Sequence, residues 1–162
     1  VRTARDVYPQ ALIFAEDDRN DPMLVDELGV NAIWADDFHH QLHVTLTGER
    51  DGYYGAYKPG VADLARCIER GWLYEGQVFS VSEKPRGKPA DGLPGPAMVY
   101  CIQNHDQVAN TIDGRRFLAE ALDSVSRDTR AVSEAATLTC SNGRVVAVSP
   151  ALRGRGRAAT FW

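Results

Sequence analysis

One pattern occurs three times in this sequence and limits what the chain can fold into. A short apolar run ends directly in a cluster of polar and titratable side chains, and a helical pattern follows. The three apolar runs are residues 11–15, 31–35 and 97–102. Runs of this length predict buried strands, and their alternation with helices predicts an α/β fold with a parallel sheet. We therefore expect the residues that follow the strands to meet at the carboxyl edge of this sheet.

Hydrophobic periodicity and helix-breaking residues place the elements between the strands. A helix is expected from Pro22 to Gly29, with Asp21 as its N-cap. Apolar residues recur at helical spacing in three further segments. These segments are residues 38–46, 61–70 and 115–125. The segment 83–96 holds four prolines and three glycines and is predicted to be a surface loop or linker.

Length and composition exclude several classes of protein. The chain has 162 residues and a net charge of −4, whereas a complete eight-stranded α/β barrel needs about 250 residues. The acidic balance does not favour a nucleic-acid partner, and no apolar run is long enough to span a membrane. The cysteines at 67, 101 and 140 form no C-x-x-C pair and fit a reducing, cytoplasmic compartment. No basic-then-apolar leader is visible at the start of the sequence, so no signal peptide is expected. Because the first residue, Val1, is not Met, we expect an upstream part to be missing.

Carboxylates at strand ends are the residues that glycoside hydrolysis needs. Glu16 follows the first apolar run directly, and Asp106 follows Gln-Asn-His after the third. One protonated carboxyl can donate a proton to the leaving oxygen while an ionised one stabilises the oxocarbenium-like centre. The alternative for each is a solvated carboxylate where a strand enters a loop. Serine-hydrolase and phosphate-loop motifs are absent from the sequence.

The segment 36–43 is rich in histidine and leaves two interpretations open. His39 and His43 are one helical turn apart and could bind zinc, with His105 or an aspartate as a third ligand. The H-E-x-x-H pattern is absent, which favours hydrogen bonding to a substrate or to a strand-end carboxylate. Aromatic residues near the same loops could stack on sugar rings or belong to the core. They are Trp34, Tyr53, Tyr54, Tyr57, Trp72 and Tyr74.

Three stretches together resemble one known family. They are IFAEDDRNDP at 13–22, WADDFHHQLHVTLTGERDGYY at 34–54 and QNHDQV at 103–108. In this order and spacing they are similar to the malto-oligosyltrehalose trehalohydrolase family, a branch of the α-amylase superfamily in glycoside hydrolase family 13. The middle stretch is the most specific, because DDFHH with LTGER and GYY separates this branch from most other amylase relatives. The resemblance covers residues 11–118.

The resemblance implies a fold, a reaction and site residues. The fold would be a partial (β/α)8 TIM barrel with strands five to seven, and with strand eight if Val145–Val148 form one. The reaction would be retaining hydrolysis of the α-1,4 bond next to the terminal trehalosyl unit of maltooligosyltrehalose, without metal or organic cofactor. Glu16 matches the general acid/base, Asp106 the transition-state stabiliser, and His105 the residue that binds hydroxyls of the same sugar. The other expected substrate-binding residues are Trp34, Asp36, Asp37, His39, His40 and Gln107.

Two departures from the family pattern shape the expected domain organisation. The family's nucleophile is an aspartate at the end of barrel strand four, and Asp6 does not match its motif. Residues 130–162 hold five arginines and one glutamate and do not match the family's C-terminal part. We therefore expect a partial catalytic barrel over residues 1–130 and an atypical basic segment, truncated or frame-shifted, over residues 131–162. Another α-amylase-type enzyme, such as a glycogen-branching enzyme, and a non-catalytic carbohydrate-binding fragment are the alternatives. The isolated chain is expected to be inactive and prone to aggregation.

Overall fold

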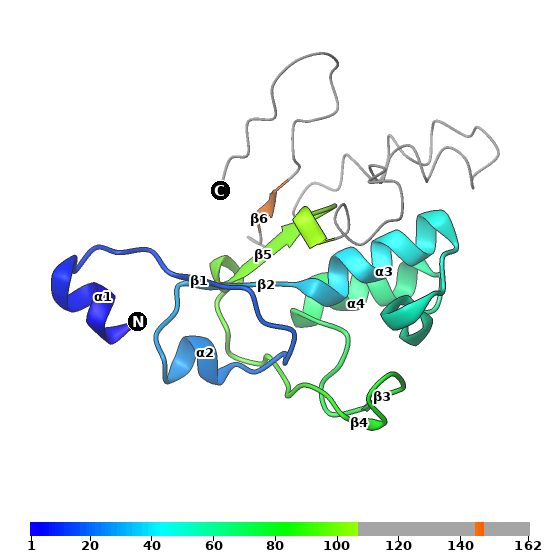
Figure 1. Ribbon diagram of the computed structural model, residues 1–162, viewed down its shortest axis with the longest axis horizontal. Helices are drawn as coiled ribbons and strands as arrows, with labels where there is room; N and C mark the ends of the chain where they lie inside the picture. The colour runs from blue at the N-terminus through cyan, green and yellow to red at the C-terminus, as the bar shows by residue number, and fades with distance from the viewer. Residues whose placement is uncertain (107–144, 148–162) are drawn as a thin grey trace, which may run out of the picture.

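A parallel sheet forms the centre of the molecule, as the sequence predicts. The computed structural model describes residues 1–106 and 145–147 (Figure 1). In these residues the sheet has the order β1-β2-β5-β6, and each neighbouring pair is parallel. The four strands are β1 (Phe14–Ala15), β2 (Ala32–Trp34), β5 (Met98–Cys101) and β6 (Val145–Ala147). All three predicted strands are confirmed, and the conditional fourth forms over three of its four residues.

The register of the sheet brings the ends of the strands to one edge. Ala15 pairs with Ile33, and Trp34 pairs with Val99. Asn31 lengthens the short β1–β2 pairing: its backbone N–H donates to the Ile13 carbonyl at 2.7 Å. Its side-chain oxygen accepts the Ile13 N–H at 2.8 Å. The residues that follow β1, β2 and β5 therefore leave the sheet on the same side.

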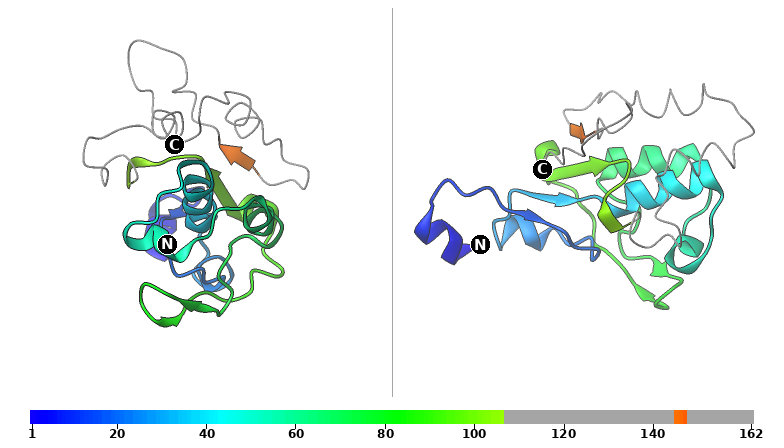
Figure 2. Two further views of the ribbon diagram at one scale, coloured as in Figure 1. Left: turned by 90° about the vertical axis from the view of Figure 1, so that its right-hand side faces the viewer. Right: turned by 45° about the horizontal axis from the view of Figure 1, so that its top comes forward.

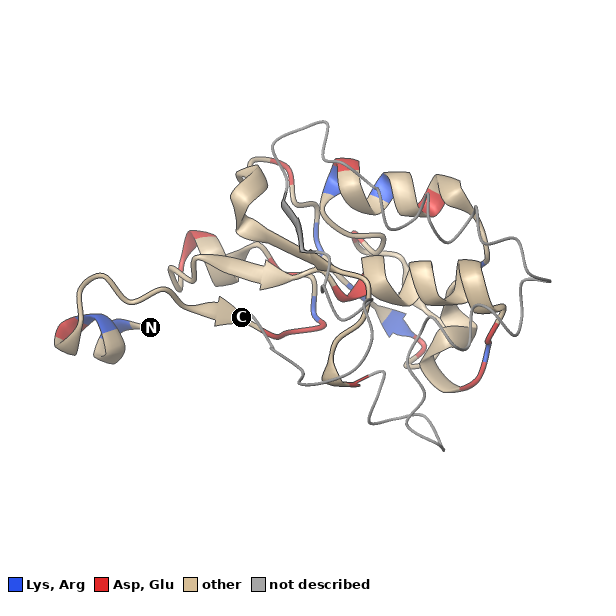
Figure 3. Cartoon of the chain, turned by 90° about the horizontal axis from the view of Figure 1, so that it is seen from above, with Lys and Arg blue, Asp and Glu red and all other residues tan. Residues whose placement is uncertain are grey.

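Two helices lie side by side beyond the carboxyl ends of the strands (Figures 1 and 2). They are α3 (Asp36–Thr47) and α4 (Val61–Arg70). The prediction for α4 is confirmed, whereas α3 begins two residues earlier than predicted. Phe38 and Leu42 of α3 are fully buried, and the Phe38 ring meets the Tyr100 ring edge-on at 5.1 Å. Charged side chains of both signs lie along α4 (Figure 3). This is the expected pattern for a helix with only one buried face.

The first helical segments differ from the sequence prediction. The helix α2 (Met23–Asp26) has a single turn and ends before Glu27. The N-cap position is Pro22 and not Asp21 as predicted, although the Asp21 side chain accepts the Met23 N–H at 3.1 Å. The helix α1 (Arg2–Val7) and the 3-10 helix η1 (Gly52–Ala56) were not predicted.

The region predicted as a surface loop contains part of a hairpin. The strands β3 (Val78–Phe79) and β4 (Lys84–Pro85) pair antiparallel, and a short 3-10 helix, η2 (Gly95–Ala97), precedes β5. The prediction of a surface loop or linker over 83–96 was therefore wrong at both ends of the segment, where β4 and η2 form. Prolines can occupy such short edge strands because few ladder hydrogen bonds are needed there.

Some predictions fall on residues that the structure does not describe. The helix expected at 115–125, the site residue Gln107 and most of the basic segment 131–162 lie outside the described residues. Within residues 1–106 and 145–147, no helix combines the length and apolar character needed to cross a membrane.

Candidate active site

Three residues that the sequence predicts as the centre of the site lie together at the edge of the sheet. Glu16 follows β1, while His105 and Asp106 follow β5. His105 Nε2 lies 3.5 Å from Glu16 Oε1 and 3.5 Å from Asp106 Oδ1. The ligand atoms of the three residues all lie within 4.8 Å of one another, and all three side chains are exposed. The structure therefore brings together the two predicted catalytic carboxylates with an imidazole between them.

The turn after β5 and the end of β2 hold this cluster in place. The Asp106 N–H donates to Asn104 Oδ1 at 3.0 Å, which tightens the turn that carries His105. The Trp34 ring meets the His105 ring edge-on, with 6.3 Å between the centroids. Trp34, a predicted substrate-binding residue, thus contacts the cluster from the middle strand.

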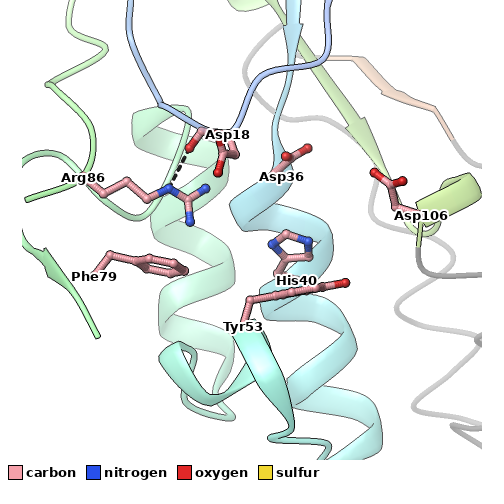
Figure 4. Close-up of a pocket in the computed structure, with 7 residues that line it drawn as sticks. All are labelled: Asp18, Asp36, His40, Tyr53, Phe79, Arg86 and Asp106. Atoms are coloured by element: carbon pink, nitrogen blue, oxygen red, sulfur yellow. Dashed lines mark hydrogen bonds between the residues drawn. The ribbon is translucent and has the colours of Figure 1, made fainter. Parts of the chain in front are cut away.

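A pocket of about 300 Å³ adjoins the cluster (Figure 4). Three of its lining residues are predicted site residues, namely Asp36, His40 and Asp106. The full lining consists of Asp18, Asp36, His40, Tyr53, Phe79, Arg86 and Asp106. The side chains converge from five segments, and their mixture of ring faces and polar groups is typical of a small-molecule site.

Two titratable groups of the pocket wall, Asp36 and His40, have pKa values shifted toward their uncharged forms. Burial raises the pKa of Asp36 to about 7, and the neighbouring carboxylates of Asp37, Asp18 and Glu16 add to the shift against the opposing effect of Arg86. Burial, followed by the positive charge of Arg86, lowers the pKa of His40 to about 3. His40 is therefore a neutral imidazole at pH 7. Neutral hydrogen-bonding groups of this kind suit the hydroxyls of an uncharged ligand.

Asp37, although adjacent to Asp36, lies inside the protein and does not line the pocket. Its side chain is fully buried. Asp37 Oδ1 accepts the Tyr57 hydroxyl at 2.7 Å. Asp37 Oδ2 accepts the Asn20 amide at 2.7 Å and the backbone N–H groups of Leu73 and Tyr74 at 2.8 and 3.0 Å. The carboxylate is thus fully hydrogen-bonded within the protein.

His39 is also buried and does not line the pocket. Its Nε2 faces Asp36 Oδ1 at 3.7 Å, and its Nδ1 lies 3.4 Å from Cys101 Sγ. Burial, with His40 as the next cause, holds the pKa of His39 well below its usual value. His39 therefore packs as a neutral ring between α3 and β5.

The alternative of a zinc site at His39 and His43 finds no support in the described residues. His43 Nε2 lies 2.6 Å from Glu49 Oε2, and its ring stacks on Tyr54 at 4.3 Å. The two imidazoles thus turn toward different carboxylates. Among residues 1–106 and 145–147, the group of three metal-type ligands is the exposed cluster described above, which contains neither of them.

Sequence reasoning missed three residues of the pocket lining, Asp18, Phe79 and Arg86, and Arg86 is the most deeply integrated of them. Its side chain is 9% exposed. Nε donates to the Asp18 carbonyl at 2.7 Å, and Nη1 donates to the Tyr57 hydroxyl at 3.1 Å. Nη2 lies 3.1 Å from Asp37 Oδ1 without the alignment of a hydrogen bond. Burial opposes the charge, but Asp37 and Tyr57 outweigh it and raise the pKa of Arg86. The guanidinium also lies 4.6 Å above the Phe79 ring.

The position of Arg86 depends on the β3–β4 hairpin. Its N–H donates to the Gln77 carbonyl at 3.0 Å, and its carbonyl accepts the Gly76 N–H at 2.7 Å. A proline- and glycine-rich segment gives no local sign of such pairing, and the partners of the side chain are far away in the sequence. Arg86 can therefore be identified as a site residue only when the hairpin and its contacts with distant segments are known.

Several proteins of known name are similar to this chain, although no family model matches it. Over 107 residues it is 53% identical to the malto-oligosyltrehalose trehalohydrolase of Deinococcus radiodurans, covering 65% of this chain and 18% of the relative. The enzyme of the same name from Saccharolobus solfataricus is 38% identical over 112 residues, which is 66% of this chain and 20% of the relative. That from Brevibacterium helvolum is 38% identical over 138 residues, which is 81% of this chain and 22% of the relative. The chain thus spans about a fifth of the length of the curated relatives it matches.

A solved structure agrees with this relationship. The crystal structure of a putative α-amylase from Salmonella typhimurium matches 91% of this chain and 26% of its own, with a TM-score of 0.73 and 29% sequence identity. This likeness confirms the predicted α/β class, while the partial barrel stays a prediction. By sequence the chain is a homologue of the malto-oligosyltrehalose trehalohydrolases, and its α/β structure resembles that of an α-amylase.

Proposed function

We propose that this chain supplies part of the active site of a glycoside hydrolase of the α-amylase type. The reaction is cleavage of the α-1,4 bond next to the terminal trehalosyl unit of maltooligosyltrehalose, with release of trehalose. The observation that carries this proposal is the convergence of Glu16 and Asp106 on His105 at the carboxyl edge of a parallel sheet. The names of the homologues support the choice of substrate.

Each residue of the cluster has a defined part in the proposed retaining mechanism. Glu16 protonates the glycosidic oxygen as the bond breaks and then accepts a proton from the water that releases the sugar. Asp106 stabilises positive charge at the reacting carbon, and His105 donates hydrogen bonds to hydroxyls of the same sugar. The family resemblance assigns the nucleophile to the end of a strand that precedes β1. Asp6 precedes β1 but lies in the helix α1, so it is not a candidate for this role.

The pocket wall provides a surface for a neutral sugar. The rings of Tyr53 and Phe79 offer apolar faces, and His40 offers an uncharged polar edge. Sugar rings have apolar C–H faces and a rim of hydroxyls, so this combination of faces and edges is complementary to them. Asp36 extends the polar part of the wall toward the cluster.

Another α-amylase-type activity is the second candidate, because the solved structural neighbour is described as a putative α-amylase. Such an enzyme would use the same two carboxylates and differ in the bond it chooses. Product analysis separates the two: free trehalose supports our proposal, whereas maltose, glucose or a new branch point supports the alternative. A carbohydrate-binding protein without catalysis would form no product and would not need Glu16.

The test places the residues in a complete enzyme. Residues 11–118 replace the matching segment of the Deinococcus radiodurans relative, and trehalose release from maltooligosyltrehalose is measured. We expect activity in this chimera and a loss of about 10²–10⁴-fold in Glu16→Gln, because a general acid contributes that much. The control is Glu27→Gln, an exposed carboxylate at the end of α2 that lies before β2. A Glu16→Gln chimera that keeps its rate would overturn the proposal.

The chain on its own gives the matching negative expectation. We expect no trehalose from the purified 162-residue protein, since the proposed mechanism needs a nucleophile from elsewhere. Release of trehalose by this protein would show that a carboxylate within the chain acts as the nucleophile.

A further inference from the structure

Two adjacent carboxylates at the start of α3 lie in opposite environments. Asp36 lines the pocket, and its Oδ1 atom is buried 3.7 Å from His39 Nε2 without a hydrogen bond. Asp37 is fully buried behind the pocket wall and accepts four hydrogen bonds from within the protein. The sequence suggests the same role for both, but the geometry separates them.

Asp37 joins four segments that are distant in the sequence. Asn20 belongs to the loop after β1, and Tyr57 directly follows the 3-10 helix η1. The N–H groups of Leu73 and Tyr74 belong to the segment after α4, and Arg86 follows the β3–β4 hairpin. Every partner of Asp37 is a hydrogen-bond donor or a cation. The buried negative charge of Asp37 is therefore compensated within the protein.

Two pocket residues depend on this arrangement. The Arg86 guanidinium enters the pocket wall from the hairpin (Figure 4), and its ion-pair partner among the described residues is Asp37, at 3.1 Å. The Tyr57 hydroxyl, which donates to Asp37, also accepts from Arg86 and lies 3.3 Å from His40 Nδ1. Arg86 and His40 are thus linked, directly or through Tyr57, to a carboxylate that does not reach the pocket.

We propose that Asp37 is a positioning residue that holds the Arg86 guanidinium in the pocket wall and, through Tyr57, orients His40. In this role it does not touch the sugar, which differs from the role expected from the sequence. The consequence for sugar binding rests on the proposed function, but the placement of Arg86 does not.

The physical reason lies in the cost of an unpaired buried cation. Without the charge of Asp37, only uncharged contacts would hold the guanidinium in place: the Phe79 ring, the Asp18 carbonyl and the Tyr57 hydroxyl. It would lose its charged partner in a setting that exposes 9% of its side chain. A buried charge without a partner is strongly unfavourable, so the side chain would turn toward water and leave the wall.

The experiment follows Arg86 directly in the full 162-residue chain. Hydrogen exchange of the Arg86 Nε–H is measured by ¹⁵N NMR in the wild type and in Asp37→Asn. We expect exchange to be about tenfold or more faster in Asp37→Asn, which corresponds to the loss of one charge-assisted interaction. The matched control is Glu75→Gln. Glu75 is also a buried carboxylate paired with arginines, Arg66 and Arg70, but it lies outside the pocket lining. Its loss should leave Arg86 exchange unchanged.

A milder variant covers the case in which Asp37→Asn does not fold. Asn20→Gly removes one donor to Asp37 at a position with φ of 55°, which glycine adopts readily. Arg86 exchange should rise in the same direction by a smaller factor. The positioning role is overturned if exchange stays within twofold of the wild type in Asp37→Asn, or in Asn20→Gly where the first variant is unfolded.

Sugar binding separates this inference from the proposed function. Titration of the same proteins with trehalose and with maltotriose, followed by NMR shifts, should show affinity about tenfold or more weaker in Asp37→Asn and unchanged in Glu75→Gln. If the wild type binds neither sugar while Arg86 exchange responds, the proposed function loses its support and the positioning role stands. If affinity falls without a change in Arg86 exchange, Asp37 acts on the sugar by another route and the positioning role fails.

Discussion

At the scale of single residues, the site depends on how each carboxylate is surrounded. The exposed carboxylates of Glu16 and Asp106 lie close together across His105. Asp36 is held in a half-buried place with other acids near it, and Asp37 is balanced by donors inside the fold. The same functional group thus serves three different purposes, because solvation and neighbouring charges decide which protonation state is favoured.

The raised pKa of Asp36 predicts a pH dependence of stability. In the folded chain the group binds its proton up to about pH 7, whereas in the unfolded chain it releases it near pH 4. Between these values Asp36 binds its proton in the folded state but not in the unfolded state. Its contribution to the free energy of unfolding therefore falls as pH rises from about 4 to 7. Asp36→Asn removes this effect, so relative to the wild type it should gain up to about 4 kcal/mol across that window.

Urea unfolding of both proteins at pH 4 and at pH 8 measures this difference. Asp26→Asn, which changes an exposed carboxylate at the end of α2, is the control and should show no comparable gain. A difference between Asp36→Asn and the wild type that stays constant with pH would contradict the prediction.

At the scale of elements, the β3–β4 hairpin completes the pocket, and one glycine allows it to approach. Gly87 has φ of 83°, and a Cβ atom at this position would lie 1.8 Å from the Tyr74 carbonyl oxygen. The neighbouring Arg86 therefore reaches the site because the backbone beside it has no side chain. This close approach involves backbone rather than a mobile side chain, so the structure cannot easily adapt to a larger residue.

Gly87→Ala is expected to destabilise the chain by about 3 kcal/mol or more, since backbone strain and a steric clash act together. Gly92→Ala is the matched control in the same segment. Gly92 has φ of 94° but no atom within 4 Å of its Cβ position, so only the strain, about 1–2 kcal/mol, should appear. Denaturant unfolding gives both values. Equal losses in the two variants would mean that the close approach to Tyr74 does not constrain the hairpin.

At the scale of the whole molecule, β1 leaves one edge of the sheet open. No strand among the described residues pairs with its outer side. Phe14 and Leu12, in and before this strand, are 53% and 71% exposed. An unpaired edge with apolar side chains invites association with other chains. The open edge of β1 is thus the surface through which the chain is expected to aggregate.

Phe14→Lys should weaken self-association of the 162-residue chain, because it replaces apolar area at the edge by a charge. The loss of one buried phenylalanine side chain corresponds to about ten- to a hundredfold in the association constant. Sedimentation velocity over a range of concentrations measures it. Val61→Lys, at the start of α4 and 76% exposed, is the control. The edge is not the interface if both variants associate as the wild type does.

Local sequence patterns are sufficient to predict the strands of the sheet and the cluster at its edge. Apolar runs that end in titratable residues have one favourable arrangement, with the runs buried in parallel and their carboxyl ends together. For this reason Glu16, His105 and Asp106 could be predicted from local patterns. The helix α4 could also be predicted from a local pattern, because its helical periodicity of apolar residues extends through its whole length.

Which other residues face the site depends on contacts between segments that are distant in the sequence. Arg86 meets the Asp18 carbonyl across 68 positions of sequence, and Asp37 meets Tyr74 across 37. Such partners are selected by the packing of loops against α3 and not by any local preference. Adjacent residues with identical side chains, Asp36 and Asp37, carry no local difference that could assign one to the pocket and the other to the interior. The direction in which each leaves the helix decides its burial, and burial decides its chemistry.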